Sequence, residues 1–168
     1  MNLQEEYLQA IHFLNLCSHA FYQKEMPFIV KKSSYEKELA ESIDNQVILK
    51  ETRYQDLAYK SLAIEVKKGQ GAFWIPEVRM AELMLQKNLQ HHWTLFIRFQ
   101  KNKKLITSIA MIPTSVLLAD MQITQEWAEK IIARDQEMKI RQRTIHCQQS
   151  YSWTALTSLP GLLKLDLK

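Results

Sequence analysis

The sequence predicts an α+β fold of the three-layer α/β type. Short stretches rich in β-branched and aromatic residues recur between residues 46 and 112, as is typical of strands. Stretches with apolar residues at three- and four-residue steps precede, interrupt and follow them, as is typical of helices that cover a sheet. The chain has 168 residues, of which 46% are hydrophobic and 24% are charged. This length and composition predict a single globular domain, residues 1–168, with a sizeable core.

The first two elements are expected to be helices. Residues 3–22 repeat apolar side chains with helical spacing, and Pro27 then breaks the pattern. The first thirty residues are therefore expected to form an N-terminal helix, residues 1–30. Ser33 or Ser34 offers an N-cap for a second helix, which is expected to end at Asp44.

Three strands should follow, at residues 46–51, 54–59 and 62–68. Their connections are short. The pair Lys60-Ser61 is a two-residue polar break, which predicts a tight hairpin between the second and third strands.

A turn at residues 69–71 leads to a helix that begins at Pro76 and runs to about Gln90, since proline suits the first helical turn. Residues 93–100 alternate apolar and polar side chains as a strand does, and residues 105–112 are expected to return as its partner.

The remaining chain, residues 105–168, is expected to be an extension of a strand and helices. A long helix is predicted over residues 124–143, with Trp127, Ile131 and Ile132 buried. A strand at 144–148 and a short helix at 152–159 complete the tail.

Three residues of the predicted hairpin carry the strongest chemical signal. Glu65 and Lys67 are two residues apart, so they project from the same face of their strand. The hairpin folds Asp56 back toward Glu65. Two neighbouring carboxylates repel each other unless a cation joins them, and hard oxygen ligands suit Mg²⁺ or Mn²⁺. The pattern therefore predicts a site for one of these divalent ions. Simple surface charge on an exposed strand is the alternative interpretation.

Asp56, Glu65, Val66 and Lys67 resemble the motif of the PD-(D/E)xK nuclease superfamily, whose fold is restriction-endonuclease-like. The resemblance covers residues 33–100, where the predicted order of helix, three strands, helix and strand is that of the family's core. Gln55 stands where the family usually has proline. The resemblance implies hydrolysis of phosphodiester bonds, more often of DNA than of RNA.

The same resemblance assigns roles to individual residues. Asp56 and Glu65 would hold the metal ion, together with the backbone carbonyl of Val66. Lys67 would assist the attacking water. Glu36, on the helix before the sheet, would complete the metal shell; the alternative is a first-turn glutamate that favours the helix dipole.

Four further residues are candidates for contact with nucleic acid. Lys68 and Lys32 belong to local basic clusters, Gln70 follows the lysine strand, and Trp74 follows the motif loop, where it would stack on a base. Solvated surface charge and a sheet-capping tryptophan are the alternative interpretations. His91-His92 is not expected to chelate one ion, because adjacent strand residues point to opposite faces.

The bulk properties fit these expectations without requiring them. A net charge of +4 is compatible with a nucleic-acid partner. The two cysteines, the acidic N-terminus and the absence of a long apolar run predict a cytoplasmic protein that does not enter membranes. A homodimer is compatible with cleavage of both strands of DNA. The rivals to a nuclease are a non-catalytic nucleic-acid-binding module on the same fold and a structural or interaction protein.

Overall fold

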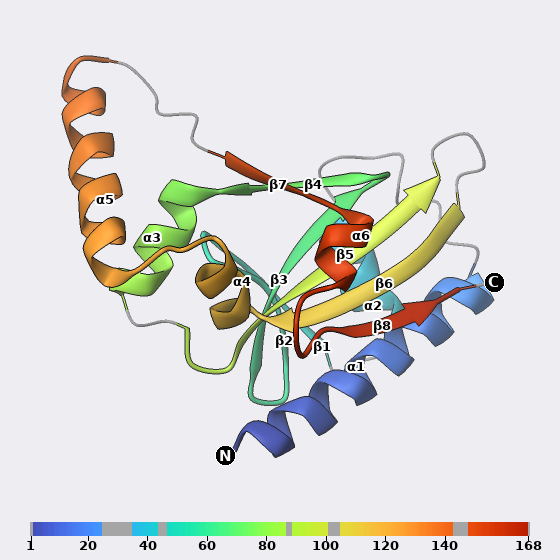
Figure 1. Cartoon of the computed structure of the whole chain (residues 1–168). Coiled ribbons are helices and arrows are strands. Elements are labelled where there is room, and N and C mark those ends of the chain that lie inside the picture. Colours follow the sequence, from blue (N-terminus) through green and yellow to red (C-terminus); the bar gives the residue numbers. More distant parts are fainter. Residues whose placement is uncertain are drawn as a thin grey trace.

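The structure is a computed structural model that describes residues 2–24, 35–43, 47–86, 89–100, 105–142 and 148–167. Helices lie before, between and after the strands along these residues (Figure 1). In chain order the elements are α1 (Leu3–Lys24), α2 (Tyr35–Ser42), β1 (Val47–Thr52), β2 (Gln55–Tyr59), β3 (Leu62–Gly69), β4 (Ala72–Pro76), α3 (Glu77–Leu85), β5 (His92–Gln100), β6 (Leu105–Pro113), α4 (Thr114–Asp120), α5 (Gln125–Ile140), β7 (Gln148–Ser152), α6 (Trp153–Thr157) and β8 (Leu163–Asp166).

Within the described residues a mixed six-stranded sheet forms the centre, in the order β1-β2-β3-β5-β6-β8. Strands β3 and β5 are parallel, and the other neighbouring pairs are antiparallel. The parallel pair needs a crossover, which β4 and α3 provide. The α+β class is therefore confirmed.

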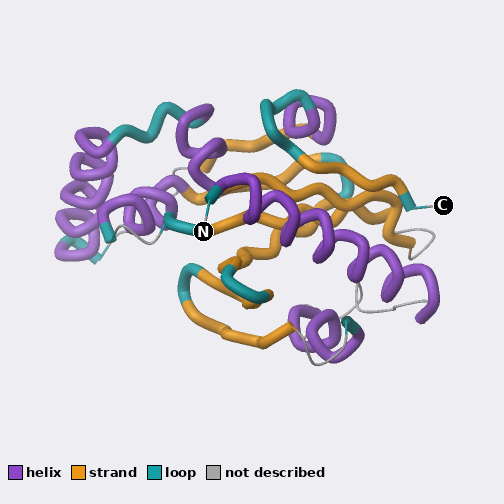
Figure 2. The backbone as a smooth tube through the Cα atoms, turned by 90° about the horizontal axis from the view of Figure 1, so that it is seen from below, coloured by secondary structure: helices purple, strands orange, loops and turns teal. Residues whose placement is uncertain are grey.

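The two faces of this sheet bury two separate apolar clusters. Ile64, Val66 and Leu95 face a cluster shared with α1 and α2, whereas Phe96 and Ala110 face one shared with α3, α4, α5, α6 and the β4–β7 pair. Figure 1 shows α1 along the underside of the sheet and β4 with β7 above it. Seen from below, α1 crosses the strands, with α2 beside it (Figure 2). The sheet is therefore the middle of three layers.

The hairpin between β2 and β3 forms at the two-residue turn that the sequence predicts. Tyr59 pairs with Leu62, and Leu57 pairs with Ile64. Lys60 adopts a φ of 51°, the left-handed conformation that tight hairpins require. The buried side chains of Leu57, Tyr59 and Ile64 fix which face of each strand meets the α1–α2 cluster. The intervening residues, Asp56 and Glu65 among them, must then face the other way.

Strands β4 and β7 form a separate two-stranded ribbon over that second face. Gly69 makes the close turn into β4 feasible, because a Cβ atom there would lie 2.5 Å from the carbonyl oxygen of Ala72. Phe73 then packs edge-on against Phe96 of the main sheet, with ring centroids 5.2 Å apart. The ribbon is thereby anchored beside the end of β3.

Several sequence expectations need correction. The sequence does not predict the strand β4, the helix α4 or the strand β8; β4 lies between the predicted turn at residues 69–71 and the predicted helix start at Pro76. Most of the strand expected at 144–148 lies outside the described residues, and β7 begins at Gln148.

The prediction that Trp127 is buried was wrong, since its exposed fraction is 46%. Helix α5 rests mainly on α3 and buries a narrow stripe formed by Ala128, Ile131 and Asp135. Ile131 is buried as predicted, but Trp127 falls beside this stripe. Among the described residues, no helix combines the length and apolar character needed to cross a membrane.

Candidate metal and catalytic site

The β2–β3 hairpin brings together Asp56, Glu65 and Lys67. The Nζ atom of Lys67 lies 3.0 Å from Oε1 of Glu65, as expected for residues on one strand face. The backbone N–H of Val66 donates a hydrogen bond to Oδ2 of Asp56 at 2.7 Å. This bond fixes the Asp56 carboxylate beside the strand that carries Glu65.

Glu65 is a buried carboxylate that is only partly satisfied. Its exposed fraction is 4%, and Lys67 and Arg79 both approach the same oxygen, Oε1, at 3.0 and 3.5 Å. The other oxygen, Oε2, is buried and has no hydrogen-bond partner among the described residues. A buried charged oxygen without a partner costs folding free energy, so such an atom points to a ligand that completes it.

Arg79 is a member of this site that the sequence did not single out. It lies in the first turn of α3, behind Pro76, and its side chain is 40% exposed. The position of Pro76 predicts the start of the helix, but the rotation of α3 about its axis decides whether Arg79 or a neighbour faces the sheet.

The carboxyl group of Asp56 is electrostatically coupled to Glu65. Burial, followed by the negative charge of Glu65, raises the pKa of Asp56 to about 7. The N–H of Val66 and the ammonium of Lys67 act in the opposite direction, whereas Glu36 adds a further increase. Near neutral pH this group is therefore poised between its protonated and charged forms.

Glu36 lies on α2 and is half-buried. Its negative charge raises the pKa of Asp56, but no described contact joins Glu36 to Glu65 or Lys67. Val66 is buried in the α1–α2 cluster and presents only its backbone toward Asp56.

The four candidate nucleic-acid residues do not converge on one point. Lys68 is half-buried and lies on the same strand face as Val66. Gln70 is exposed, and its carbonyl accepts a hydrogen bond from Nε of Arg98 at 3.2 Å. Trp74 is 59% exposed on β4. Lys32 lies outside the described residues.

A buried polar network lies next to Glu65 on β5. Oγ1 of Thr94, which pairs with Glu65 across the parallel strands, lies 2.8 Å from Oγ1 of Thr114, and the latter lies 2.6 Å from Nδ1 of His92. Nε2 of His92 is 2.6 Å from the carbonyl oxygen of Tyr54, so the ring donates there and accepts at Nδ1. Burial lowers the pKa of His92, against the opposing influence of Glu65. This imidazole is therefore neutral. It joins β5 to the β1–β2 turn through Tyr54 and to α4 through Thr114.

No sequence motif indicates a function for this network. His91 and His92 point to opposite sides, as expected: Nδ1 of His91 lies 3.0 Å from Glu6 on α1. The alternation that places Thr94 and Phe96 on one face also places His92 there. Extending that alternation from Thr94 back to residue 92 predicts that His92 is a polar residue on this inward face.

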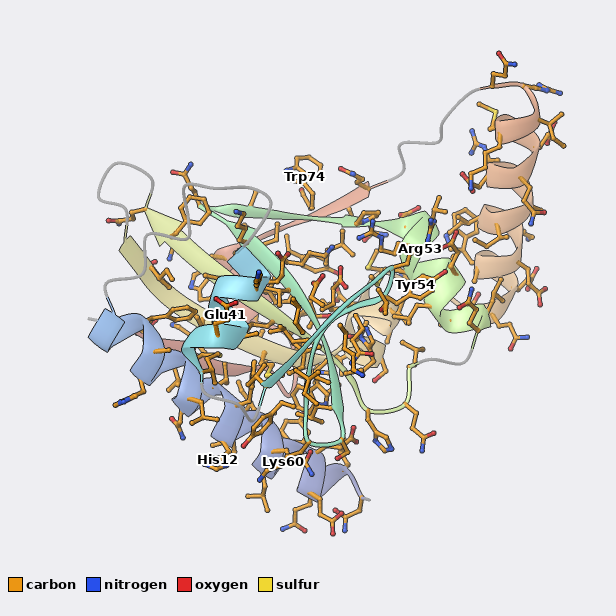
Figure 3. All side chains as sticks on the ribbon, turned by 180° about the vertical axis from the view of Figure 1, so that it is seen from behind. His12, Glu41, Arg53, Tyr54, Lys60 and Trp74 are labelled. Carbon is orange, nitrogen blue, oxygen red and sulfur yellow. The ribbon has the colours of Figure 1, made fainter. Side chains whose placement is uncertain are left out.

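A second carboxylate cluster positions α3. Arg53 donates two hydrogen bonds to the carboxylate of Glu82, at 2.7 and 2.8 Å, and the hydroxyl of Tyr54 donates a third at 2.8 Å. Figure 3 shows Arg53 and Tyr54 together at the tip of the β1–β2 hairpin, beside α3. The hydrogen bonds from Arg53 and Tyr54 to Glu82 thereby tie α3, which also carries Arg79, to the turn before the strand of Asp56.

An open volume of about 400 Å³ lies by the β1–β2 turn and the starts of β3 and β5. Gln55, next to Asp56, and Ala63, on the same strand face as Glu65, are part of its wall. The complete lining is Thr52, Tyr54, Gln55, Ala63, Leu83, Gln90, His91 and His92. Neither Asp56 nor Glu65 is part of this lining, so the volume is not the carboxylate site itself.

Within the described ranges, no three histidine, cysteine, aspartate or glutamate side chains group closely enough to hold a metal ion. The donor set consists of the carboxylates of Asp56 and Glu65. Such a set suits Mg²⁺, which commonly binds one or two carboxylates and completes its shell with water and substrate phosphate. The orphaned Oε2 of Glu65 and the raised pKa of Asp56 both fit a cation between the two groups.

Comparison with known proteins adds no relative: no family model, curated protein or solved structure matches this chain. The geometry of the site alone supports a function.

Proposed function

We propose that this protein is a metal-dependent nuclease of the PD-(D/E)xK type, which hydrolyses phosphodiester bonds of DNA. The observation that carries the proposal is the buried Oε2 of Glu65, which has no hydrogen-bond partner within the described part of the chain. It lies in a cluster with Asp56 and Lys67, the residues expected of the nuclease motif. The order α2, β1, β2, β3, α3, β5, with β4 inserted, supports a restriction-endonuclease-like core.

Asp56 and Glu65 would hold Mg²⁺ or Mn²⁺. A divalent ion bound there supplies positive charge to the developing phosphorane and lowers the pKa of a bound water. Loss of the proton from Asp56, whose pKa is about 7, gives the site its second negative charge at mildly alkaline pH. Val66 holds that carboxylate in place through its N–H.

Lys67 and Arg79 would act on the substrate. Both cations now share one oxygen of Glu65, and both side chains retain some exposure, 17% and 40%. When Glu65 is engaged by a cation, their positive charge becomes available to the non-bridging oxygens of a phosphate. Lys67 also positions the water, whose oxygen bonds to phosphorus as the bond to the leaving sugar oxygen breaks. The attacking water loses a proton to solvent in this step, and the leaving sugar oxygen takes one up from solvent.

A non-catalytic nucleic-acid-binding module is the second candidate. One observation favours it: Lys67 and Arg79 already neutralise Glu65 without a metal ion. A protein of this kind would bind nucleic acid without a divalent ion and cleave no substrate. Cytoplasmic location and action as a homodimer remain proposals of the nuclease interpretation.

The test combines Mn²⁺ titration by calorimetry with plasmid nicking, on wild type, Glu65→Gln and Glu82→Gln. Glutamine keeps the volume of each side chain and removes one charge. We expect wild type and Glu82→Gln to bind Mn²⁺ and nick the plasmid, and Glu65→Gln to do neither. Removal of one preorganised electrostatic contact to a transition state typically slows a reaction by about 10²–10³-fold.

Circular dichroism of each variant checks that the fold is retained. Nicking by Glu65→Gln at the wild-type rate would refute the proposed site. Wild-type protein that neither binds Mn²⁺ nor cleaves any DNA would refute the nuclease and favour the binding module.

A further inference from the structure

We propose that the outer face of the β4–β7 ribbon binds single-stranded nucleic acid by stacking a base on Trp74. This stacking face is formed by Ala72, Trp74, Gln148, Ser150 and Ser152. The inference deepens the proposed nuclease function by naming its substrate class, and its test requires no cleavage.

The ribbon alternates between a buried and an exposed face. Phe73, Ile75 and Tyr151 are buried against the main sheet, with exposed fractions of 6% or less. On the other face, Ala72, Trp74, Gln148, Ser150 and Ser152 are exposed, and Pro76 is half-buried. Because the register pairs Trp74 with Ser150 and Ala72 with Ser152, the indole is surrounded by small side chains. Figure 3 shows Trp74 projecting outward from the ribbon.

A single exposed indole among small polar neighbours suits a planar ring better than a protein surface. Protein partners usually bury a contiguous apolar patch of several side chains, and Ser150, Ser152 and Gln148 provide none. A nucleobase needs only one aromatic face. Base–aromatic stacking contributes roughly 1–3 kcal/mol per base and tolerates any sequence.

The surrounding charge favours a phosphate backbone. Arg98 lies beside the turn into β4, where it donates to the carbonyl of Gln70, and Lys67 is near the end of the preceding strand. Arg79 follows Trp74 by five residues, so the chain limits the separation of their Cα atoms to roughly 17 Å. A strand held at Trp74 therefore reaches the cations beside Glu65 within a few nucleotides. None of the five residues of the stacking face is acidic.

Duplex DNA would not use this face well, because its bases are already stacked and paired. Single strands bind proteins through a positive groove and aromatic platforms, and they expose the base faces that an indole can cover. The stacking face therefore selects a single-stranded region, such as a flap, a gap or an unpaired end.

The experiment measures binding of a fluorescein-labelled oligothymidine of roughly 12 nucleotides, within the site sizes typical of such grooves. Anisotropy is recorded in EDTA, so that no metal is bound and no cleavage occurs. Wild type, Trp74→Ala, Trp74→Phe and Trp127→Ala are compared. Trp127, on α5, is the matched control because it is the other substantially exposed tryptophan of the described chain, at 46%.

We expect Trp74→Ala to weaken binding roughly 10- to 100-fold, as loss of one stacked base predicts. Trp74→Phe should retain most of the affinity, and Trp127→Ala all of it. Binding should also quench the tryptophan emission of wild type but not that of Trp74→Phe, a readout that a purely structural role would not change. A duplex of the same length should bind more weakly than the single strand.

Wild-type affinity in Trp74→Ala, or preference for the duplex, would overturn the inference. Neither result would affect the nuclease proposal, which depends on Mn²⁺ binding and nicking. Conversely, Trp74-dependent binding by a protein that cleaves nothing would support the stacking face while refuting the nuclease. A matching oligouridine determines whether the strand is DNA or RNA.

Discussion

Glu65 is buried and Glu82 is half-buried, and each lies beside an arginine. Only Glu82 has a hydrogen-bond partner on both carboxylate oxygens among the described residues. Both oxygens of Glu82 accept hydrogen bonds, from Arg53 and Tyr54, at 2.7–2.8 Å. Glu65 is more deeply buried, with 5% of its side chain exposed against 16% for Glu82, yet one of its oxygens has no partner among the described residues.

The difference separates a structural ion pair from a site that a ligand would complete. Arg53 binds the Glu82 carboxylate in a bidentate manner, with one hydrogen bond to each oxygen. Neither oxygen of Glu82 is therefore left for a metal ion. Lys67 and Arg79 instead crowd the same oxygen of Glu65. Buried groups left unsatisfied reduce stability, and proteins retain them mainly where function needs them.

The largest expected effect of a substitution concerns the two arginines. Arg79→Ala should slow single-turnover cleavage at saturating Mn²⁺ by about 10²-fold, because it removes a cation from the phosphate position. Arg53→Ala should leave this rate near that of wild type, since Arg53 pairs only with Glu82 among the carboxylates that the structure describes. Equal losses in both variants would mean that the rate depends on the docking of α3 and not on the charge of Arg79 at the phosphate.

A smaller effect concerns pH. Asp56, with a pKa of about 7, must lose its proton before it can bind a cation. The affinity for Mn²⁺ should therefore fall by about tenfold per pH unit below pH 7 and level off above it, as displacement of one proton requires. Calorimetry across pH 5.5–8.5, values chosen to span this pKa by about 1.5 units, should show this slope in wild type. In Asp56→Asn the affinity should be weak at every pH. A steep slope in that variant would assign the proton to another group.

The smallest effect is on stability, and it has opposite signs at the two clusters. The pKa of Asp56 is higher in the folded chain than the ordinary value of about 3.9, so the folded state binds more protons between roughly pH 4 and 7. The free energy of unfolding therefore falls as the pH rises through this range. Without metal, Asp56→Asn should be more stable than wild type above pH 7, by on the order of 1 kcal/mol. Asparagine can still accept the hydrogen bond from Val66.

Glu82→Ala should instead lower the free energy of unfolding, by about 1 kcal/mol, because it removes hydrogen bonds that are partly exposed to solvent. Urea unfolding in EDTA at pH 6 and pH 8, on either side of the pKa of about 7, measures both changes. Destabilisation by Asp56→Asn at pH 8 would show that burial of the charged Asp56 carboxylate does not lower the free energy of unfolding.

Much of the hairpin could be predicted from residues close together in the sequence. The alternation of β3 places Glu65 and Lys67 on one face, and the short break at Lys60-Ser61 sets the register that brings Asp56 beside them. The expected elements match the observed ones to within a few residues through β6, apart from β4 and the end of α3, which lies at Leu85 and not at about Gln90. Local periodicity and turn chemistry are sufficient here because each interaction spans few residues.

The rest of the site depends on how distant elements are rotated and docked. Arg79 reaches Glu65 because α3 docks against the sheet, where Glu82, about one turn further along, bonds to Arg53 and Tyr54. The exposure of Trp74 depends on β7, a strand from the far end of the chain that pairs with β4. Neither contact leaves a periodic signal in the sequence.

By itself, then, the sequence determined the α+β class, the β2–β3 hairpin and the shared face of its charged residues. Side-chain alternation and turn preference are properties of neighbouring residues. Only the tertiary structure decided that Glu65 is buried with one oxygen unsatisfied, that Arg79 joins it, and that Trp74 lies on an open ribbon. Burial and pairing across the fold depend on which surfaces meet, and many distant residues together set that packing.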